Sequence, residues 1–404
     1  MTPFWPNPLR RPHSPGRWLR ALWLLALLAS CGGGVDSGGT GASPQSFASG
    51  PITGFGSVIV NGVRFDDSAA SVTDDGGTPR SRDDLRLGMT TEIRGSAITV
   101  DASGSTVAAA SSISFGSDLL GPLSSIDLAA KRLVVLGQTV AVSATTVFDD
   151  SSVPGGLPAL TVGEVVEVYA LFDAAAGRYS ATRIERKSAA AAYRLRGVVS
   201  GLDTAAKAFS IGSERISYAG FAGTLPATLA NGSFVRVRLQ PAQVGGVWLV
   251  AGLSDGFQQP REFDDVRLEG SINAFTSAVQ FSVNGVPVDA GGVTPPPGLA
   301  LGVRVEVEGI SRGGVLVAAK LKVKDAGGGG GNQEFELRSA ITSVDAANLS
   351  FVLRGVTVQY SLTAPATDFR DGTAANLAVG VNVEARGMLS ADGTRLQAAR
   401  ITFK

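Results

Sequence analysis

The sequence predicts an all-β protein, a tandem array of small β-barrel repeats of the OB-like or SH3-like kind. Three observations support this prediction. Apolar and charged residues alternate along many short segments, as they do in half-buried strands. One order of sequence signatures recurs five times. Turn-forming pairs such as Asn-Gly separate short apolar runs, and no segment after the leader has helical periodicity.

The composition is that of a folded β protein. The 404 residues include 52 glycines without a period of three, and 17% of the residues are charged. Disordered chains have few β-branched residues and a high net charge, whereas this chain is rich in valine and has 35 basic and 35 acidic residues. Nucleic-acid binding usually requires a basic stripe, and the sequence has none. We therefore expect no nucleic-acid partner.

Residues 1–30 have the features of a lipoprotein signal peptide. Four arginines precede a short apolar run at 21–28, which is too short to cross a bilayer. The run ends in Leu28-Ala29-Ser30-Cys31, which resembles the bacterial lipobox. The alternative is an ordinary signal peptide with an incidental cysteine. Because the only cysteine of the chain stands at the position that lipidation uses, we predict that Cys31 is acylated, with palmitate among its chains.

Residues 31–49 are predicted to be the lipid anchor and a flexible, disordered tether, since glycine, serine, threonine, alanine and proline dominate them. Two or more acyl chains give stable attachment to a membrane. In lipoproteins of this kind an aspartate after the cysteine often signals inner-membrane retention, and here Gly32 follows. We expect a protein of the bacterial cell envelope, anchored to the outer membrane and exposed to the periplasm or the surface.

Five repeats follow the tether. The clearest signature is an apolar residue, a glycine and then a strand that alternates valine with charge, as in residues 301–309. Its glycines are Gly88, Gly163, Gly232, Gly302 and Gly380. Each unit also opens with a glycine-containing strand, has a tight hairpin turn and closes with a further strand. The predicted boundaries are 50–115, 116–187, 188–257, 258–326 and 333–404, with a glycine linker at 327–332.

Two details of the repeats predict local structure. Val60-Asn61-Gly62-Val63 and its counterpart at 283–286 suit a type I′ hairpin, because Asn-Gly tolerates positive φ at both central residues. A unit of about 70 residues is marginally stable alone. Packing between neighbouring repeats would compensate for this, but solenoid repeats usually run about 20–50 residues, so we favour an array of beads over a continuous solenoid.

These motifs resemble those of the bacterial envelope family known as domain of unknown function 5666. The resemblance rests on the opening strand, the Val-Asn-Gly-Val turn, the Leu-x-Val-Gly-x-x-Val-Glu-Val strand and the closing Ala-x-x-Ile. It covers nearly all of residues 50–404; repeats 1, 4 and 5 match best, and repeat 3 has Arg236 at the glutamate position. It implies an envelope location and small barrel-like modules, and it supplies no catalytic residues.

The chemistry open to the mature protein is restricted. His13 is the only histidine and Cys31 the only cysteine, so no free imidazole or thiol is expected after processing. A Ser-His-Asp or Cys-His arrangement then lacks its base, and zinc lacks its usual ligands. We expect a protein that is not an enzyme and that has no cofactor.

Carboxylates remain as candidates. A hydrolase with paired acids is a minor alternative, because neighbouring residues of a strand point to opposite faces; the pairs are at 66–67, 74–75, 83–84, 149–150 and 264–265. Calcium takes six to eight oxygen ligands, which clustered loop carboxylates can supply. The calcium candidates lie in repeat 1, where a solvated acidic loop is the simpler interpretation: Asp66, Asp67, Asp74, Asp75, Asp83 and Asp84.

Aromatic residues are few, and those in strand-like runs are expected in the core: Phe55, Phe65, Phe275, Phe281, Phe351 and Trp248. The sequence therefore predicts a non-enzymatic, lipid-anchored envelope protein whose array binds or spaces other components. Its partners would be the membrane, through the acyl chains, and an envelope protein or glycan. Carbohydrate or peptidoglycan binding is the main alternative.

Overall fold

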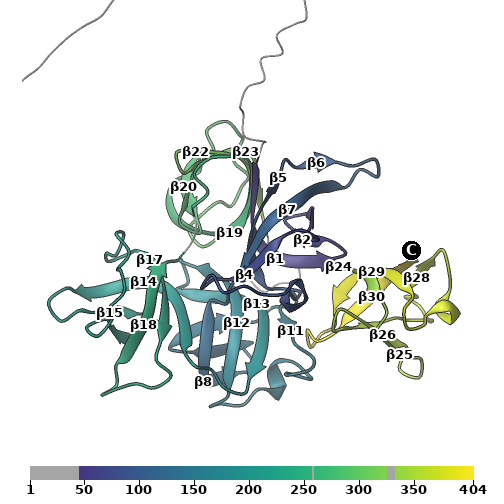
Figure 1. Ribbon diagram of the computed structural model, residues 1–404, viewed down its shortest axis with the longest axis horizontal. Coiled ribbons are helices and arrows are strands. Elements are labelled where there is room, and N and C mark those ends of the chain that lie inside the picture. Colours follow the sequence, from purple (N-terminus) through teal and green to yellow (C-terminus); the bar gives the residue numbers. More distant parts are fainter. Residues whose placement is uncertain (1–44, 257–258, 325–332) are drawn as a thin grey trace, which may run out of the picture. The chain divides into compact units, whose positions relative to one another are not determined.

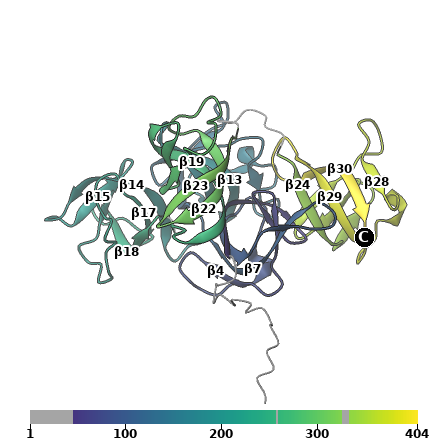
Figure 2. The ribbon, with the colours of Figure 1, turned by 90° about the horizontal axis from the view of Figure 1, so that it is seen from above.

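The computed structural model describes residues 45–256, 259–324 and 333–404 (Figures 1 and 2). The described chain is all-β, and its helical segments are three single 3₁₀ turns, η1 (Arg82–Asp84), η2 (Leu157–Ala159) and η3 (Ala374–Asn376). None of the helical segments found there is long and apolar enough to cross a bilayer. The predicted signal peptide 1–30, the acylated Cys31 and the glycine linker 327–332 lie outside the described residues.

Five small closed barrels confirm the predicted repeats, and repeat 4 shows their plan. Strands one, two and three form antiparallel hairpins, strand three runs parallel to strand five, and strand four joins strand five to strand one. This closed order, 1-2-3-5-4-1, is a Greek-key barrel of the OB type. In repeat 4 the strands are β19 (Phe263–Ser277), β20 (Gln280–Val283), β21 (Val286–Asp289), β22 (Arg304–Arg312) and β23 (Val315–Val323).

The other repeats share this order and add short strands. Repeat 1 contains β1 (Gln45–Phe55), β2 (Val58–Val60), β3 (Val63–Asp66), β4 (Ser71–Asp74), β5 (Thr90–Ser96), β6 (Thr99–Val100) and β7 (Thr106–Phe115). Repeat 2 contains β8 (Leu119–Asp127), β9 (Arg132–Val135), β10 (Gln138–Ala141), β11 (Val147–Phe148), β12 (Val165–Asp173) and β13 (Arg178–Lys187).

Repeat 3 has the five principal strands alone, and in repeat 5 the first strand is interrupted. Repeat 3 contains β14 (Tyr193–Asp203), β15 (Ala208–Ile211), β16 (Glu214–Ser217), β17 (Phe234–Leu239) and β18 (Trp248–Asp255). Repeat 5 contains β24 (Phe335–Ala340), β25 (Ser343–Asp345), β26 (Ser350–Leu353), β27 (Val356–Gln359), β28 (Asp368–Arg370), β29 (Asn382–Leu389) and β30 (Leu396–Phe403).

The hairpin turns have the predicted geometry. Asn61 has a φ of 51° and Gly62 a φ of 74°, and the pair at 284–285 has 50° and 78°. Positive φ at both central residues is what a type I′ turn requires, and it matches the twist of the flanking strands. Leu136 and Arg354 take the first position in repeats 2 and 5, each followed by a glycine with positive φ.

The glycine before strand four closes every barrel. All five signature glycines have φ between 78° and 93°, a region that disfavours residues with a Cβ. In repeat 5 the Gly380 N–H donates to the Ile341 carbonyl (2.9 Å), and the Ile341 N–H donates to the Val381 carbonyl (2.9 Å). The same two bonds recur in the other repeats, where the apolar partners on strand one are Ile52, Leu123, Val199 and Ile272. This two-bond closure explains why the glycine recurs.

β1 begins earlier than the sequence predicted. Residues 45–49 were expected in the tether, but they form the first half of β1 and pair with β5. The same residues also pair in parallel with β19 of repeat 4, with Ser46 opposite Asp265. The reason is Phe47, which is 1% exposed and contacts Phe263 with ring centroids 5.5 Å apart. The small polar residues around it conceal this anchor in the sequence.

The two faces of β1 serve different cores. Phe47 belongs to the hydrophobic cluster of repeat 4, whereas the next residue, Ala48, belongs to that of repeat 1. Successive side chains of a strand point to opposite faces, so one strand can fill two cores. At the other end of β1, Gly54 pairs in parallel with Glu336 of β24. A Cβ at Gly54 would lie 2.5 Å from the Glu336 carbonyl oxygen, so glycine permits this approach.

Repeats 2 and 3 are joined in the same manner, through their first strands. Leu119 and Leu120 of β8 pair antiparallel with Leu195 and Arg194 of β14. One hydrophobic cluster combines residues of both repeats, from Leu119 to Leu253. These pairings show that repeats 2 and 3 pack together.

The closing glycines generate a graded prediction. Gly380→Ala should destabilise the protein by about 1–2 kcal/mol, the cost of a left-handed backbone for a residue with a Cβ. Gly88→Ala should cost more, because its Cβ would also lie 2.3 Å from the Thr182 carbonyl oxygen. Gly220 has open space around it and no positive φ, so Gly220→Ala is the matched control. Urea unfolding followed by circular dichroism measures the order, and equal midpoints for the three variants would contradict it.

Candidate functional site: charge clusters at the repeat junctions

The six aspartates offered as calcium ligands do not converge on one site. In the described part of the chain, no three acidic, histidine or cysteine side chains are placed to hold a metal ion. Asp74 instead accepts the N–H groups of Gly76 and Thr78 and pairs with Arg80 at 2.7 Å. Burial opposes its ionisation, yet these hydrogen bonds and Arg80 lower the pKa of Asp74.

The other five candidates are separately engaged or exposed. Asp66 accepts the Ser68 N–H, Asp84 accepts the Ser81 N–H, and Asp67 lies 4.0 Å from Arg82. The side chain of Asp83 is 88% exposed. Two of them face other repeats: Asp75 pairs with Arg236 of repeat 3 at 3.2 Å, and Asp83 lies 4.0 Å from Arg354 of repeat 5.

The acid pairs outside repeat 1 also contact separate partners. Asp149 pairs with Arg183, whereas the Asp150 carboxylate accepts a hydrogen bond from Thr357 of repeat 5 at 3.2 Å. The two acids at 264–265 bind different arginines, Arg312 and Arg267. Each carboxylate has a structural contact of its own, as the alternation of side chains along a strand predicts.

Most of the aromatic predictions are confirmed. Phe55, Phe65, Phe281, Phe351 and Trp248 are all buried. Phe275 is the exception, because it is 37% exposed. It lies close to the turn between β19 and β20, where the strand extends past the core, and its ring stacks on Phe281 at 6.5 Å.

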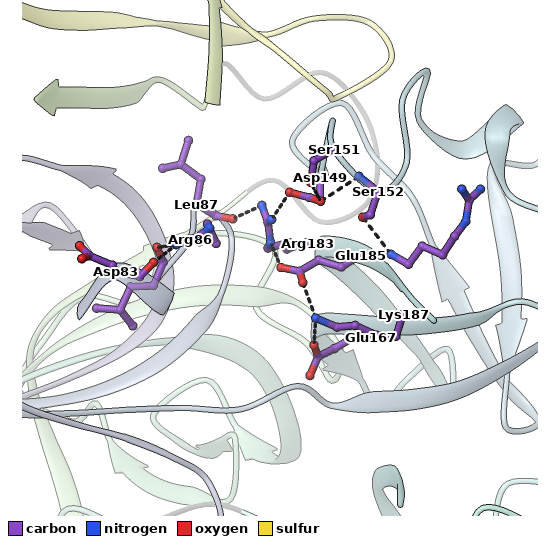
Figure 3. A network of polar contacts seen from close by, with 12 residues as sticks. Asp83, Arg86, Leu87, Asp149, Ser151, Ser152, Glu167, Arg183, Glu185 and Lys187 are labelled. Atoms are coloured by element: carbon purple, nitrogen blue, oxygen red, sulfur yellow. Dashed lines mark hydrogen bonds and ion pairs between the residues drawn. The ribbon is translucent and has the colours of Figure 1, made fainter. Parts of the chain in front are cut away.

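A buried arginine is the centre of an extended polar network (Figure 3). The Arg183 side chain is 3% exposed and pairs with Asp149 at 3.0 Å and with Glu185 at 2.5 Å. Its third contact is with repeat 1, where Nη1 donates to the Leu87 carbonyl at 3.3 Å. Leu87 precedes the closing glycine of repeat 1, so Arg183 attaches repeat 2 to the closure of its neighbour.

The network continues with alternating charge. Lys187 pairs with Glu185 at 2.6 Å and with Glu167 at 2.9 Å, and Glu167 pairs with Arg194 of repeat 3 at 3.0 Å. Arg183, Glu185 and Lys187 alternate along β13 and therefore share one face. Glu167 lies directly opposite Glu185 across β12 and β13. The cations offset the repulsion between these two acids.

The pKa shifts of Glu185 and Lys187 agree with this arrangement of charges. Burial disfavours the charged form of Glu185, yet the charges of Arg183 and Lys187 outweigh it and lower its pKa. Burial likewise disfavours the charged Lys187, but Glu167 and Glu185 raise its pKa. Glu185 and Lys187 therefore stabilise each other's charged form.

A second buried pair joins repeats 2 and 3. Arg196 donates to Asp118 at 2.9 Å, and the side chains are 7% and 3% exposed. The Ala170 N–H donates to the other oxygen of Asp118 at 2.8 Å. Burial raises the pKa of Asp118, and the charge of Arg196 counteracts this effect. Burial also raises the pKa of Asp75, a residue of repeat 1 that faces Arg236 of repeat 3.

These charges line a small pocket between repeats 1, 2, 3 and 4. Its walls include Asp75, Arg196, Arg236, Glu269 and Asn284. The interior offers about 40 Å³ to water-sized molecules. Since one water requires roughly 10–15 Å³ by this measure, the space suits a few waters and not a sugar ring. The arrangement can therefore fix neighbouring repeats, but it has no room for an oligosaccharide.

Sequence reasoning missed most of this site. Its visible signal was Arg236, which departs from the repeat pattern and proves to face Asp75. Arg183, Asp118 and Arg196 carried no such signal, because arginines and acids in alternating strands are normally solvated. Their burial depends on which repeats meet.

Removal of the buried arginine tests the network. Arg183→Ala should leave the buried Glu185 and the partly buried Asp149 without their shared cation, and such a loss typically costs about 3–5 kcal/mol. Arg178→Ala is the matched control on the same strand, because Arg178 is 28% exposed and lies 3.7 Å from Asp173. Such a pair contributes at most about 1 kcal/mol. The urea unfolding midpoints of both variants, compared with the wild type, measure these costs. Equally small shifts of the midpoint for Arg183→Ala and Arg178→Ala would contradict a structural role for the network.

Comparison with protein families agrees with this organisation. The model of the family described as "Domain of unknown function (DUF5666)" matches residues 121–185, 269–322 and 339–402. These segments correspond to repeats 2, 4 and 5, and repeats 1 and 3 have the same strand order. A search of curated proteins gave no match. Three segments of the chain are therefore similar to the DUF5666 domain, which is consistent with tandem repeats of that domain.

Proposed function

We propose that this protein is a lipid-anchored component of the bacterial cell envelope, whose joined barrels form a non-enzymatic scaffold that binds or spaces other envelope components. The anchor would be Cys31, with the Leu-Ala-Ser-Cys sequence and the preceding apolar run as support. Gly32 after the cysteine favours the outer membrane. Under this proposal the array is exposed to the periplasm or to the cell surface.

The observation that carries the scaffold proposal is the coupling between repeats. β1 pairs with β19 and β24, and β8 pairs with β14, so backbone hydrogen bonds continue from one barrel to another. Arg196 adds a buried ion pair with Asp118 between repeats 2 and 3, and the buried Arg183 donates a hydrogen bond to the Leu87 carbonyl of repeat 1. A binding surface that is fixed in advance loses less conformational freedom on binding. Several equivalent modules held together also bind with avidity, even if each one binds weakly.

A single experiment in cells tests this function. Tagged wild-type protein and Cys31→Ala are expressed, fed with labelled palmitate, crosslinked in intact cells and fractionated. The wild type should carry the label, remain with membranes and recover an envelope protein in stoichiometric amount. Cys31→Ala should lose the label and leave the membrane fraction, because the acyl chains supply its attachment. Ser37→Ala, six residues further on, is the control that should behave as the wild type.

The other outcomes are equally informative. Recovery of glycan without any protein would favour the carbohydrate-binding alternative. A defined turnover by the purified protein would contradict a non-enzymatic role. Unlabelled wild-type protein in the soluble fraction would contradict the anchor.

A further inference from the structure

One continuous sheet passes through repeats 1 and 4. Its strands follow the order β7, β5, β1, β19, β22 and β23, and each neighbouring pair is hydrogen-bonded. The first residue of β1, Gln45, lies opposite the last residue of β5, Ser96. On the other side, Ser46 lies opposite Asp265, near the start of β19. The start of β1 therefore lies at the edge of the sheet where β5 and β22 end.

Two hairpins continue past the start of β1, and both expose aliphatic side chains. In repeat 1 the hairpin is β6 with the start of β7, where Val100 is 69% exposed. In repeat 4 the hairpin joins β22 to β23, where Ile310 lies opposite Val317 and Val315 opposite Arg312. Ile310, Val315 and Val317 are 38–42% exposed. These aliphatic side chains are exposed to water, and their burial against an apolar surface would be favourable.

The chain itself indicates what covers this edge. Cys31 is 14 residues before Gln45 in the sequence. At 3.3–3.6 Å per residue, that distance is at most about 50 Å. If Cys31 is acylated, the lipid is therefore attached within about 50 Å of the start of β1, and the chain that leads to it leaves the described residues at this edge.

The charges at this edge limit how deeply it enters a membrane. Arg312 is paired with Asp264 at 2.5 Å, and both side chains are about half exposed. The Asp101 carboxylate, in the turn after Val100, accepts hydrogen bonds from Ser103 and Ser105. An ionised carboxylate resists entry into hydrocarbon, whereas aliphatic groups at the interface gain by losing contact with water.

We propose that this edge, formed by Val100 of repeat 1 and Ile310, Val315 and Val317 of repeat 4, contacts the headgroup region of the membrane that holds the lipid anchor. The proposal rests on the lipid anchoring proposed above. The contact would orient the array relative to the bilayer, with β1 directed away from the membrane.

The test places a fluorescent label at this edge of the acylated full-length protein. Val100→Cys and Val317→Cys are labelled with an environment-sensitive maleimide, since an acylated Cys31 does not react with maleimide. Val244→Cys of repeat 3 and Val379→Cys of repeat 5 are the controls, being 63% and 67% exposed. Each protein is reconstituted into phosphatidylethanolamine and phosphatidylglycerol vesicles, with nitroxide-labelled lipids near the headgroup or deep in the chains.

The proposal predicts a blue shift and strong quenching by the headgroup-level nitroxide for the labels at positions 100 and 317, with little quenching by the deep nitroxide. Labels at positions 244 and 379 should show neither effect. Flotation of the proteins with the vesicles measures the anchor separately. Equal, unquenched emission from all four floating proteins would overturn the proposed edge contact alone. Failure to float would overturn the anchor and the contact that rests on it.

Discussion

Hydrogen bonding along both edges of β1 is the interaction on which the array depends. In a closed barrel of this type the first strand pairs with strand four along its first half and with strand two along its second half. Each half of β1 therefore has one edge left for pairing outside its own barrel. In the first half this edge pairs with β19 of repeat 4, and in the second half with β24 of repeat 5. Closure of each barrel by its glycine and coupling between barrels thus use the same strand.

The faces of β1 strengthen this coupling. Ala48 fills the core of its own repeat 1, whereas Phe47 fills that of repeat 4, so repeat 4 does not complete its core from its own sequence alone. The buried ion pairs play a different role. An ion pair contributes little net stability when both charges lose their hydration, but an incorrect neighbour would leave a charge unpaired. Arg196, which pairs with Asp118 of the neighbouring repeat, therefore favours the correct junction over alternative ones.

The internal plan of each repeat could be predicted from sequence, because it depends on local patterns. The closing glycines need positive φ, the Asn-Gly pairs form the expected turns, and valines alternate with charges along the strands. The junctions could not be predicted in this way. Phe47 lies among serines, alanines and glycines that resemble a tether, and Arg183 alternates with Glu185 as an exposed residue would. Whether such side chains are buried depends on contacts between residues far apart in sequence.

Amide hydrogen exchange of Phe47→Ala, compared with the wild type, tests the central role of β1 most directly. Removal of a buried phenylalanine typically costs about 3–5 kcal/mol. If β1 completes the core of repeat 4, exchange should accelerate in β19, β20 and β21, more than 200 residues away in sequence. Acceleration confined to residues 45–55, with repeat 4 protected as in the wild type, would contradict the account.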